Sequence, residues 1–190
     1  MIEYYDNNNK FYFNETVKLP IHSQLIQFLD KLPEKSNVLD LGCGSGRDSL
    51  FMIKRGFNVT SLDGSEGMAE LASEYIENEV LVMDYLEMNW EDKFDGIWAN
   101  AGLVHCTDSY LEEVLPKIIK ALKTKGLFYC SFKVNEKETI DERGRYYNNW
   151  VASRLLLFIS NFSELQLVHL QQSQGFRKGE KWVNMITEKT

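Results

Sequence analysis

The sequence has few cysteines and no long apolar run. Three cysteines are spread over 190 residues without a C-x-x-C pair, which argues against a disulfide framework or a zinc site and fits a reducing compartment. No stretch approaches the roughly 20 apolar residues that span a bilayer. The first ten residues are polar and acidic, unlike a secretory signal. We therefore expect a soluble, cytoplasmic protein with no metal and no membrane partner.

Basic residues are also scarce. The chain has 21 Lys and Arg against 28 Asp and Glu, which gives a net charge of −7. Proteins that bind nucleic acids usually present a basic surface, so a nucleic-acid partner is disfavoured and a small-molecule partner is favoured. The length is that of about one domain. A hydrophobic content of 44% is enough for a core without disulfide or metal support.

Helical apolar spacing alternates with short apolar runs along the chain. The spacing predicts helices over 21–32, 48–54, 65–76, 110–122 and 150–159, and a break or kink at Pro116. Strands are predicted over 37–41, 57–62, 80–83, 94–99 and 126–132, with an antiparallel pair over 165–170 and 181–186. Such alternation is typical of a parallel sheet with helices on both faces. The short run of asparagines at 7–9 predicts a turn or a mobile segment.

The most informative segment is V-L-D-L-G-C-G-S-G-R-D at 38–48. Gly42, Gly44 and Gly46 follow a predicted strand and precede a predicted helix. Glycine permits a positive φ and close approach of a ligand to the backbone, and the start of a helix attracts anionic groups. An ordinary tight turn and a dinucleotide site are alternatives. The dinucleotide fingerprint G-x-G-x-x-G, however, needs glycine where Arg47 stands.

The pattern apolar-apolar-acid-apolar-G-x-G-x-G resembles motif I of the class I S-adenosylmethionine-dependent methyltransferases. Segments 59–65, 83–85, 94–105 and 124–132 resemble later motifs of that family, although a single Gly126 stands where the family commonly has Pro-Gly-Gly. The G-R-D-S sequence at 46–49 and the His-Ser pair at 22–23 resemble the small bacterial tellurite-resistance-like methyltransferases. This resemblance implies an α/β, three-layer Rossmann-like methyltransferase sandwich. Its seven-stranded sheet would be mostly parallel, with an antiparallel C-terminal hairpin.

The resemblance also implies one methyltransferase domain over 1–190, with an N-terminal lid and first helix over 1–33 and a cofactor-binding core over 34–190. The implied cofactor is S-adenosyl-L-methionine, and the product is S-adenosyl-L-homocysteine. Asp63 would bind the ribose hydroxyls, Asp84 the adenine amino group and Asp40 the methionine amino group. The implied cofactor contacts are Asp40, Gly42, Cys43, Gly44, Gly46, Arg47, Asp63, Gly64, Ser65, Met68, Met83, Asp84, Tyr85, Ala99 and Asn100.

Simpler interpretations of these residues stay open. Asp63 in its D-G-S turn is also typical of a helix cap, and Asp84 of a surface acid at a strand end. Met68 and Met83 fit a plain core as well as an adenine wall. We interpret Cys43 as a small residue beneath the cofactor and not as a nucleophile.

Three segments would face the methyl acceptor in this architecture. His105, after the fourth strand, is the candidate catalytic base, although a buried or capping histidine fits as well. The aromatic residues of 1–17 predict either a lid over the cofactor or a hydrophobic anchor. Arginines and tyrosines at 143–147 fit an anionic acceptor or a solvated turn. The candidate acceptor-binding residues are Tyr5, Tyr12, His105, Arg143, Arg145 and Tyr146.

We therefore predict methyl transfer to a small-molecule nucleophile, such as a thiol, a chalcogen oxyanion or a carboxylate-bearing metabolite. The methyl group of a sulfonium is already activated, so positioning alone can supply roughly 7–11 kcal/mol. A general base would add about 10²–10⁴-fold only where the acceptor needs deprotonation. Alternatives are an NAD(P)-binding oxidoreductase and an S-adenosylmethionine-binding regulator without turnover. We expect a monomer or a weak homodimer.

Overall fold

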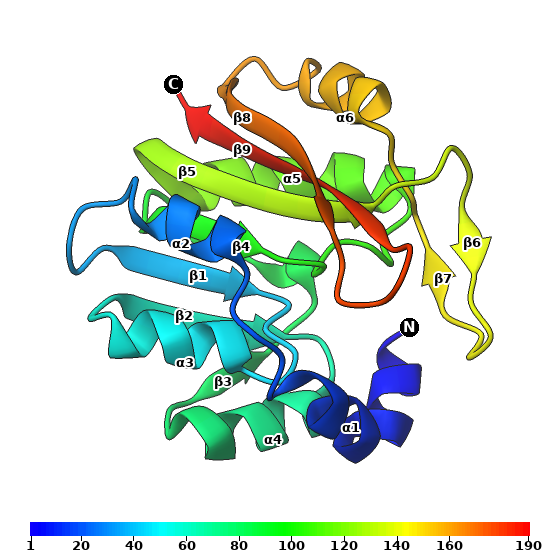
Figure 1. Cartoon of the computed structure of the whole chain (residues 1–190). Helices are drawn as coiled ribbons and strands as arrows, with labels where there is room; N and C mark the ends of the chain where they lie inside the picture. The colour runs from blue at the N-terminus through cyan, green and yellow to red at the C-terminus, as the bar shows by residue number, and fades with distance from the viewer.

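A computed structural model describes residues 1–190, and its centre is one seven-stranded sheet (Figure 1). The strand order is β3-β2-β1-β4-β5-β9-β8. The first five strands of this order pair in parallel, and β9 is antiparallel to both β5 and β8. The bounds are β1 (Asn37–Leu41), β2 (Asn58–Asp63), β3 (Val80–Val82), β4 (Phe94–Ala99), β5 (Leu122–Lys133), β8 (Leu165–Gln174) and β9 (Lys181–Lys189). The predicted fold class is confirmed.

Helices cover both faces of the sheet. The helices are α1 (Ile2–Thr16), α2 (Ser23–Leu29), α3 (Arg47–Lys54), α4 (Glu66–Ile76), α5 (Asp108–Ala121), α6 (Ala152–Ile159) and a 3-10 turn, η1 (Tyr85–Glu87). Apolar side chains of α2, α3 and α4 pack on one face, and those of α5 and α6 pack on the other. A small hairpin, β6 (Thr139–Ile140) and β7 (Tyr146–Tyr147), lies apart from the sheet. None of the helices is long and apolar enough to cross a membrane.

Alternation along the central strands sorts their side chains between the two faces. Trp98 of β4 and Tyr129 of β5 are register partners whose rings stack with centroids 3.8 Å apart. Phe28 of α2 packs on the same side, 5.3 Å from the Trp98 ring. Because β1 lies between β2 and β4, the strand order reverses beside it, and in open α/β sheets ligands bind where the order reverses. Figure 1 shows α1 and the β6–β7 hairpin at the edge toward which β1 and β2 point.

Helix α5 passes through Pro116 without interruption, so the predicted break is wrong. A proline inside a helix costs about 3 kcal/mol relative to alanine. Each fully buried apolar side chain contributes about 1.5–3 kcal/mol. Leucine, valine and isoleucine side chains of α5 are buried at helical spacing on both sides of the proline, so packing outweighs the lost hydrogen bond.

The N-terminal segment is also more regular than predicted. The asparagines at 7–9 lie inside α1, and the chain departs from helical angles only at Asn8, with φ −124° and ψ 18°. The expected turn is therefore a kink within a helix. No residue of α1 is buried, which explains why apolar spacing gave no signal for this helix.

The packing of α5 makes a direct stability prediction. Ile118 is fully buried in the main core, whereas Leu157 of α6 is 71% exposed. Ile118→Ala should lower the free energy of unfolding by about 2–5 kcal/mol, because it leaves a cavity. Leu157→Ala should change it by no more than about 0.5 kcal/mol. Urea unfolding of both variants checks this, and equal losses would contradict the assigned core.

Candidate functional site

The loop after β1 depends on glycine. Gly42, Gly44 and Gly46 all have positive φ, at 76°, 55° and 73°. A Cβ at Gly42 would lie 2.6 Å from the Tyr85 hydroxyl and 2.8 Å from the Gly102 Cα. A Cβ at Gly46 would lie 2.8 Å from the Ile76 side chain of α4. The loop is therefore tightly packed at Gly42 and open at Gly44, where only the Tyr12 ring lies within 4 Å, and Gly46 serves the packing of α3 against α4.

Asp63, the last residue of β2, fastens this loop to the next one. Its carboxylate accepts hydrogen bonds from the backbone N–H of Gly44 and of Ser65, both at 2.9 Å. Burial raises the pKa of the Asp63 carboxyl above its ordinary value, and the two backbone hydrogen bonds oppose that shift. Asp63 thus holds the ends of β1 and β2 in a fixed relation, with its carboxylate at the floor of a cavity.

That first cavity has a volume of about 310 Å³. It is bounded by the ends of β1, β2 and β3, by the loop after β4 and by α1. Asp84 caps η1 by accepting from the Leu86 N–H at 2.8 Å, and it also accepts from the Tyr110 hydroxyl at 2.6 Å. Predicted cofactor contacts that line this cavity are Gly42, Gly44, Asp63, Gly64, Ser65, Met68, Met83, Asp84 and Tyr85.

A second cavity of about 200 Å³ lies on the other side of the glycine loop. Its lining includes the predicted residues Asp40, Cys43, Arg47 and Asn100. Burial raises the pKa of the Cys43 thiol well above its ordinary value, which is unfavourable for a nucleophile. The two cavities share Tyr5, Tyr12, Gly42, Gly44, Ala101 and His105, so they meet there.

Two predicted cofactor residues lie outside both cavities. Ala99 is fully buried in the main core, and Gly46 faces α4 as described above. Ala99 is the last residue of β4, and the residue after it, Asn100, lines the second cavity instead. The contacts of these two residues with the cofactor remain predictions.

Buried acids dominate one wall of the second cavity. The Asp40 carboxylate accepts a hydrogen bond from the Ser49 hydroxyl at 2.6 Å. Burial, followed by the nearby Asp48 carboxylate, raises the pKa of Asp40 to about 8. Asp48 is better compensated, since it pairs with Arg47 at 2.7 Å and accepts from the Trp98 and Asn100 side chains at 3.0 Å each. This wall therefore carries a neutral Asp40 beside a paired Asp48 at neutral pH.

His105 lies where the two cavities meet. Its Nε2 is 2.7 Å from the Tyr5 hydroxyl, and its Nδ1 contacts the Tyr146 carbonyl oxygen. A carbonyl only accepts, so Nδ1 carries the proton and Nε2 accepts from Tyr5. Burial lowers the pKa of His105 to about 4. The ring is therefore neutral at neutral pH, with an acceptor nitrogen directed at the junction.

Helix α1 covers this junction and is fastened to α4. The Asp6 carboxylate accepts from the Ser65 hydroxyl at 2.5 Å and from the Gly67 N–H at 3.2 Å, at the start of α4. Carboxylates are favoured at that end of a helix. Sequence reasoning missed Asp6, because its role arises only when α1 docks on α4. Tyr5 and Tyr12 of the same helix line both cavities, as expected of acceptor-facing residues.

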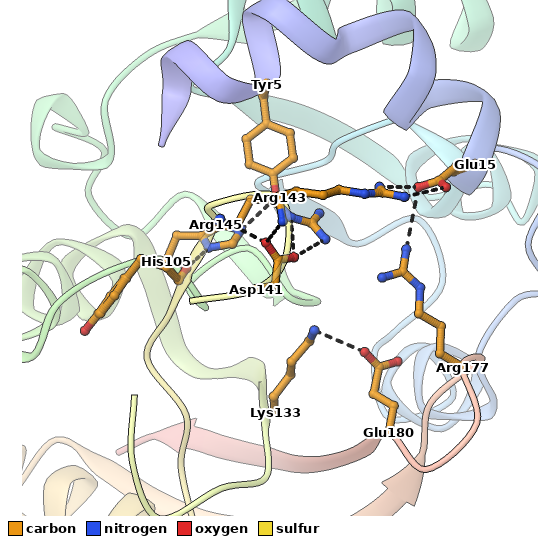
Figure 2. Close-up of polar contacts among 10 residues, drawn as sticks. Tyr5, Glu15, His105, Lys133, Asp141, Arg143, Arg145, Arg177 and Glu180 are labelled. Atoms are coloured by element: carbon orange, nitrogen blue, oxygen red, sulfur yellow. Dashed lines mark hydrogen bonds and ion pairs between the residues drawn. The ribbon is translucent and has the colours of Figure 1, made fainter. Parts of the chain in front are cut away.

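The arginines and tyrosines of the β6–β7 hairpin divide between two surroundings. Arg145 lines the second cavity and pairs with Asp141 at 2.7 Å. Arg143 instead points to Glu15 of α1, at 2.9 Å, and lines neither cavity (Figure 2). Tyr146 also lines neither and contributes its carbonyl to His105, while its neighbour Tyr147 lines the second cavity. Contacts of the Arg143 and Tyr146 side chains with the acceptor remain predictions.

Further residues of the second cavity were not foreseen. Lys133 at the end of β5 pairs with Glu180 at 3.2 Å (Figure 2), and its ammonium lies 3.9 Å from the centre of the Tyr147 ring. Trp182 of β9 and Arg177 of the β8–β9 connection complete this wall. Apart from Lys133, these residues come from β9 and the β8–β9 connection, where no motif in the sequence marks a site.

Comparison with known proteins finds similarity to methyltransferases. Residues 38–126 match the family model described as a methyltransferase domain. The putative methyltransferase YqeM of Bacillus subtilis is 32% identical over 119 residues, covering 55% of this chain and 47% of that protein. The probable S-adenosyl-L-methionine-dependent methyltransferase TehB of Haemophilus influenzae Rd is 26% identical over 189 residues, covering 89% and 62%. The chain thus spans about half to two thirds of these relatives.

A solved structure is similar over the whole chain. It is the 1,6-didemethyltoxoflavin-N1-methyltransferase of Burkholderia thailandensis, solved with S-adenosylhomocysteine. Its TM-score is 0.78 at 22% identity, with 100% of this chain and 85% of that chain covered. At this identity the likeness concerns the fold.

The buried Asp40 generates a pH prediction. Its pKa is about 8 in the folded chain and about 3.9 in an unfolded one, so the folded state holds the extra proton between these values. The contribution of Asp40 to the free energy of unfolding should then fall as pH rises from about 4 to about 8, whereas the lowered pKa of His105 contributes in the opposite direction. Asp40→Asn should flatten that fall, measured by urea unfolding across this range. Asp30→Asn, at an exposed ion pair with Arg55, is the control. Parallel curves for Asp40→Asn and the unmodified chain would contradict the assignment.

Proposed function

We propose that this chain, which carries a class I S-adenosylmethionine-dependent methyltransferase domain and resembles the TehB-like proteins, transfers a methyl group to a small-molecule nucleophile. One observation carries the proposal: a cavity lined by Asp63 opens into a second cavity at Tyr5, Tyr12 and His105. Two substrates could therefore meet at a junction covered by α1. The net charge of −7 favours a small acceptor over a nucleic acid.

The groups of the first cavity fit the nucleoside end of the cofactor. The Asp63 carboxylate already receives two backbone N–H groups, and its other lone pairs could accept the ribose hydroxyls. Met68 and Met83 offer apolar walls for adenine, and Asp84 offers an acceptor for its amino group. A volume of about 310 Å³ is at the lower end of ordinary ligand cavities.

The second cavity fits the amino acid end. Asp40 and the Arg47–Asp48 pair line it beside the open backbone of the glycine loop. An incoming ammonium group would favour the ionised form of Asp40, since an opposite charge lowers the pKa of a buried carboxyl. Arg47 would hold the carboxylate. We propose that Cys43 only provides a small side chain there.

Positioning by this chain would supply most of the acceleration. When bound, the cofactor supplies a methyl group already activated on a positively charged sulfur. Tyr5, Tyr12 and His105 would exclude water from the junction and orient the acceptor, which can contribute roughly 7–11 kcal/mol. With a pKa of about 4, His105 is a weak base. We therefore assign His105 Nε2 the role of accepting a hydrogen bond from the acceptor's hydroxyl or thiol, in place of the one that it accepts from the Tyr5 hydroxyl.

The far wall of the second cavity suits an anionic acceptor. It is lined by three basic side chains, those of Lys133, Arg145 and Arg177, and by one acidic side chain, that of Glu180. The aromatic rings of Tyr147 and Trp182 lie beside these groups. A carboxylate-bearing or oxyanionic small molecule would meet both features.

The cofactor assignment is tested by calorimetry. Titration with S-adenosylhomocysteine should give saturable binding to one site, and titration with NADH should give none. Binding of NADH alone would indicate an oxidoreductase. If S-adenosylhomocysteine binds but labelled methyl groups never reach any small molecule of a cell extract, the chain is a regulator without turnover.

The role of Asp63 is tested by Asp63→Asn. A hydrogen bond to a charged group contributes about 1.5–3 kcal/mol, so loss of the charge should weaken S-adenosylhomocysteine binding by about 10- to 100-fold. Asp30→Asn, far from either cavity, should bind as the unmodified chain does. Thermal unfolding must accompany the titration to show that Asp63→Asn still folds. Unchanged affinity in a folded variant would remove Asp63 from the site.

A further inference from the structure

One carboxylate of α1 joins three segments that are far apart in the sequence. Glu15 accepts two hydrogen bonds from the Arg143 guanidinium, at 2.9 and 3.1 Å. Its carboxylate is also 3.5 Å from the guanidinium of Arg177. Figure 2 shows the two guanidinium groups reaching Glu15 from different sides. The two parallel N–H···O bonds from Arg143 are the geometry with which arginine binds carboxylate ligands.

This three-residue contact lies at the rim of the second cavity. Arg177 lines that cavity, and so does Thr16, the residue after Glu15. Arg145 lines it as well, two residues along the hairpin from Arg143. The two arginines that Glu15 holds therefore stand beside the second cavity, Arg177 in its lining and Arg143 next to it through Arg145.

Helix α1 gives no local reason for an acid at this position. Glu15 lies in the last turn, and that turn contains no basic residue. The partial negative charge at the C-terminal end of a helix disfavours a carboxylate. The hydrogen bond from Arg143 lowers the pKa of Glu15 below its ordinary value, so Glu15 is charged at neutral pH. The favourable contacts of the Glu15 carboxylate therefore come from Arg143 and Arg177 and not from its own helix.

The other ion pairs of the second cavity differ in kind. Arg145 pairs with Asp141 in its own hairpin, and Lys133 pairs with Glu180 beside a neighbouring strand. These pairs do not depend on α1. The contact of Glu15 with the two arginines does depend on α1, because Glu15 belongs to that helix. The exposed fraction of the side chain is 31% for Glu15, 36% for Arg143 and 58% for Arg177. Exposed ion pairs are weak, so another anion can compete with Glu15.

We propose that Glu15 is an internal carboxylate ligand of a two-arginine site, and that a carboxylate of the methyl acceptor takes its place. This deepens the proposed function and rests on it. The site selects acceptors that carry a carboxylate. It also links their entry to the release of α1 from the rim. An internal ligand raises the apparent dissociation constant in inverse proportion to the fraction of molecules whose site is open.

The test uses Glu15→Gln and malonate, a small carboxylate probe. Malonate is titrated calorimetrically into the whole chain saturated with S-adenosylhomocysteine, at ionic strength matched with sodium chloride. If Glu15 holds the arginines in about nine of ten molecules, Glu15→Gln should bind malonate about tenfold more tightly. Glu3→Gln, on the same helix and with no ion pair, makes the same change of charge and should bind malonate as the unmodified chain does. Adding Arg143→Met to Glu15→Gln should abolish the gain.

The outcomes separate this proposal from the one on which it rests. Equal malonate affinity in Glu15→Gln and the unmodified chain overturns it, and so does an equal gain in Glu3→Gln, which would indicate a general charge effect. Weaker S-adenosylhomocysteine binding in Glu15→Gln without a malonate gain also overturns it, because Glu15 would then only fasten α1. Failure of the unmodified chain to bind S-adenosylhomocysteine refutes the proposed function itself. Thermal unfolding confirms that each variant is folded.

Discussion

The site depends on one partly buried carboxylate that accepts backbone hydrogen bonds from two different loops. Asp63 ends β2, and its two oxygens hold the N–H groups of Gly44 and Ser65. Those bonds fix the loop after β1 relative to the start of α4, where Asp6 in turn fastens α1. The loop after β1, the start of α4 and helix α1, which all bound the first cavity, are thus held together by one connected set of hydrogen bonds. A carboxylate removed from water needs hydrogen-bond donors, and here the donors are the backbone N–H groups of Gly44 and Ser65, which belong to the site itself.

Two unlike cavities meet over this framework. The first is lined mainly by open backbone, methionines and tyrosines, and the second by charged groups and aromatic rings. Although the chain is acidic overall, basic side chains gather in the second cavity. His105 stands between the two cavities with a fixed tautomer, because its Nδ1–H donates a hydrogen bond to the Tyr146 carbonyl oxygen. Under the proposed function the nucleoside end of the cofactor would occupy the first cavity, its amino acid end and the acceptor would share the second, and methyl transfer would take place at the junction.

The features that sequence could predict are local ones. Gly42, Gly44 and Asp63 follow apolar strands directly, so strand order and parallel pairing bring them to one edge. Helix α1 could not be predicted, because none of its residues is buried. The direction of the Arg143 side chain could not be predicted either, because it is set by an ion pair with Glu15, more than a hundred residues away in the sequence. The break predicted at Pro116 was wrong for the opposite reason. The local preference of proline against a helix interior was outweighed by the packing of α5 in the core.

A crystal structure of the chain with S-adenosylhomocysteine tests the central claim most directly. The account predicts the nucleoside in the first cavity with its ribose hydroxyls on the Asp63 carboxylate, and the amino acid end against Gly42 and Gly44. A nucleoside bound elsewhere, or an Asp63 carboxylate turned away from it, would contradict the account.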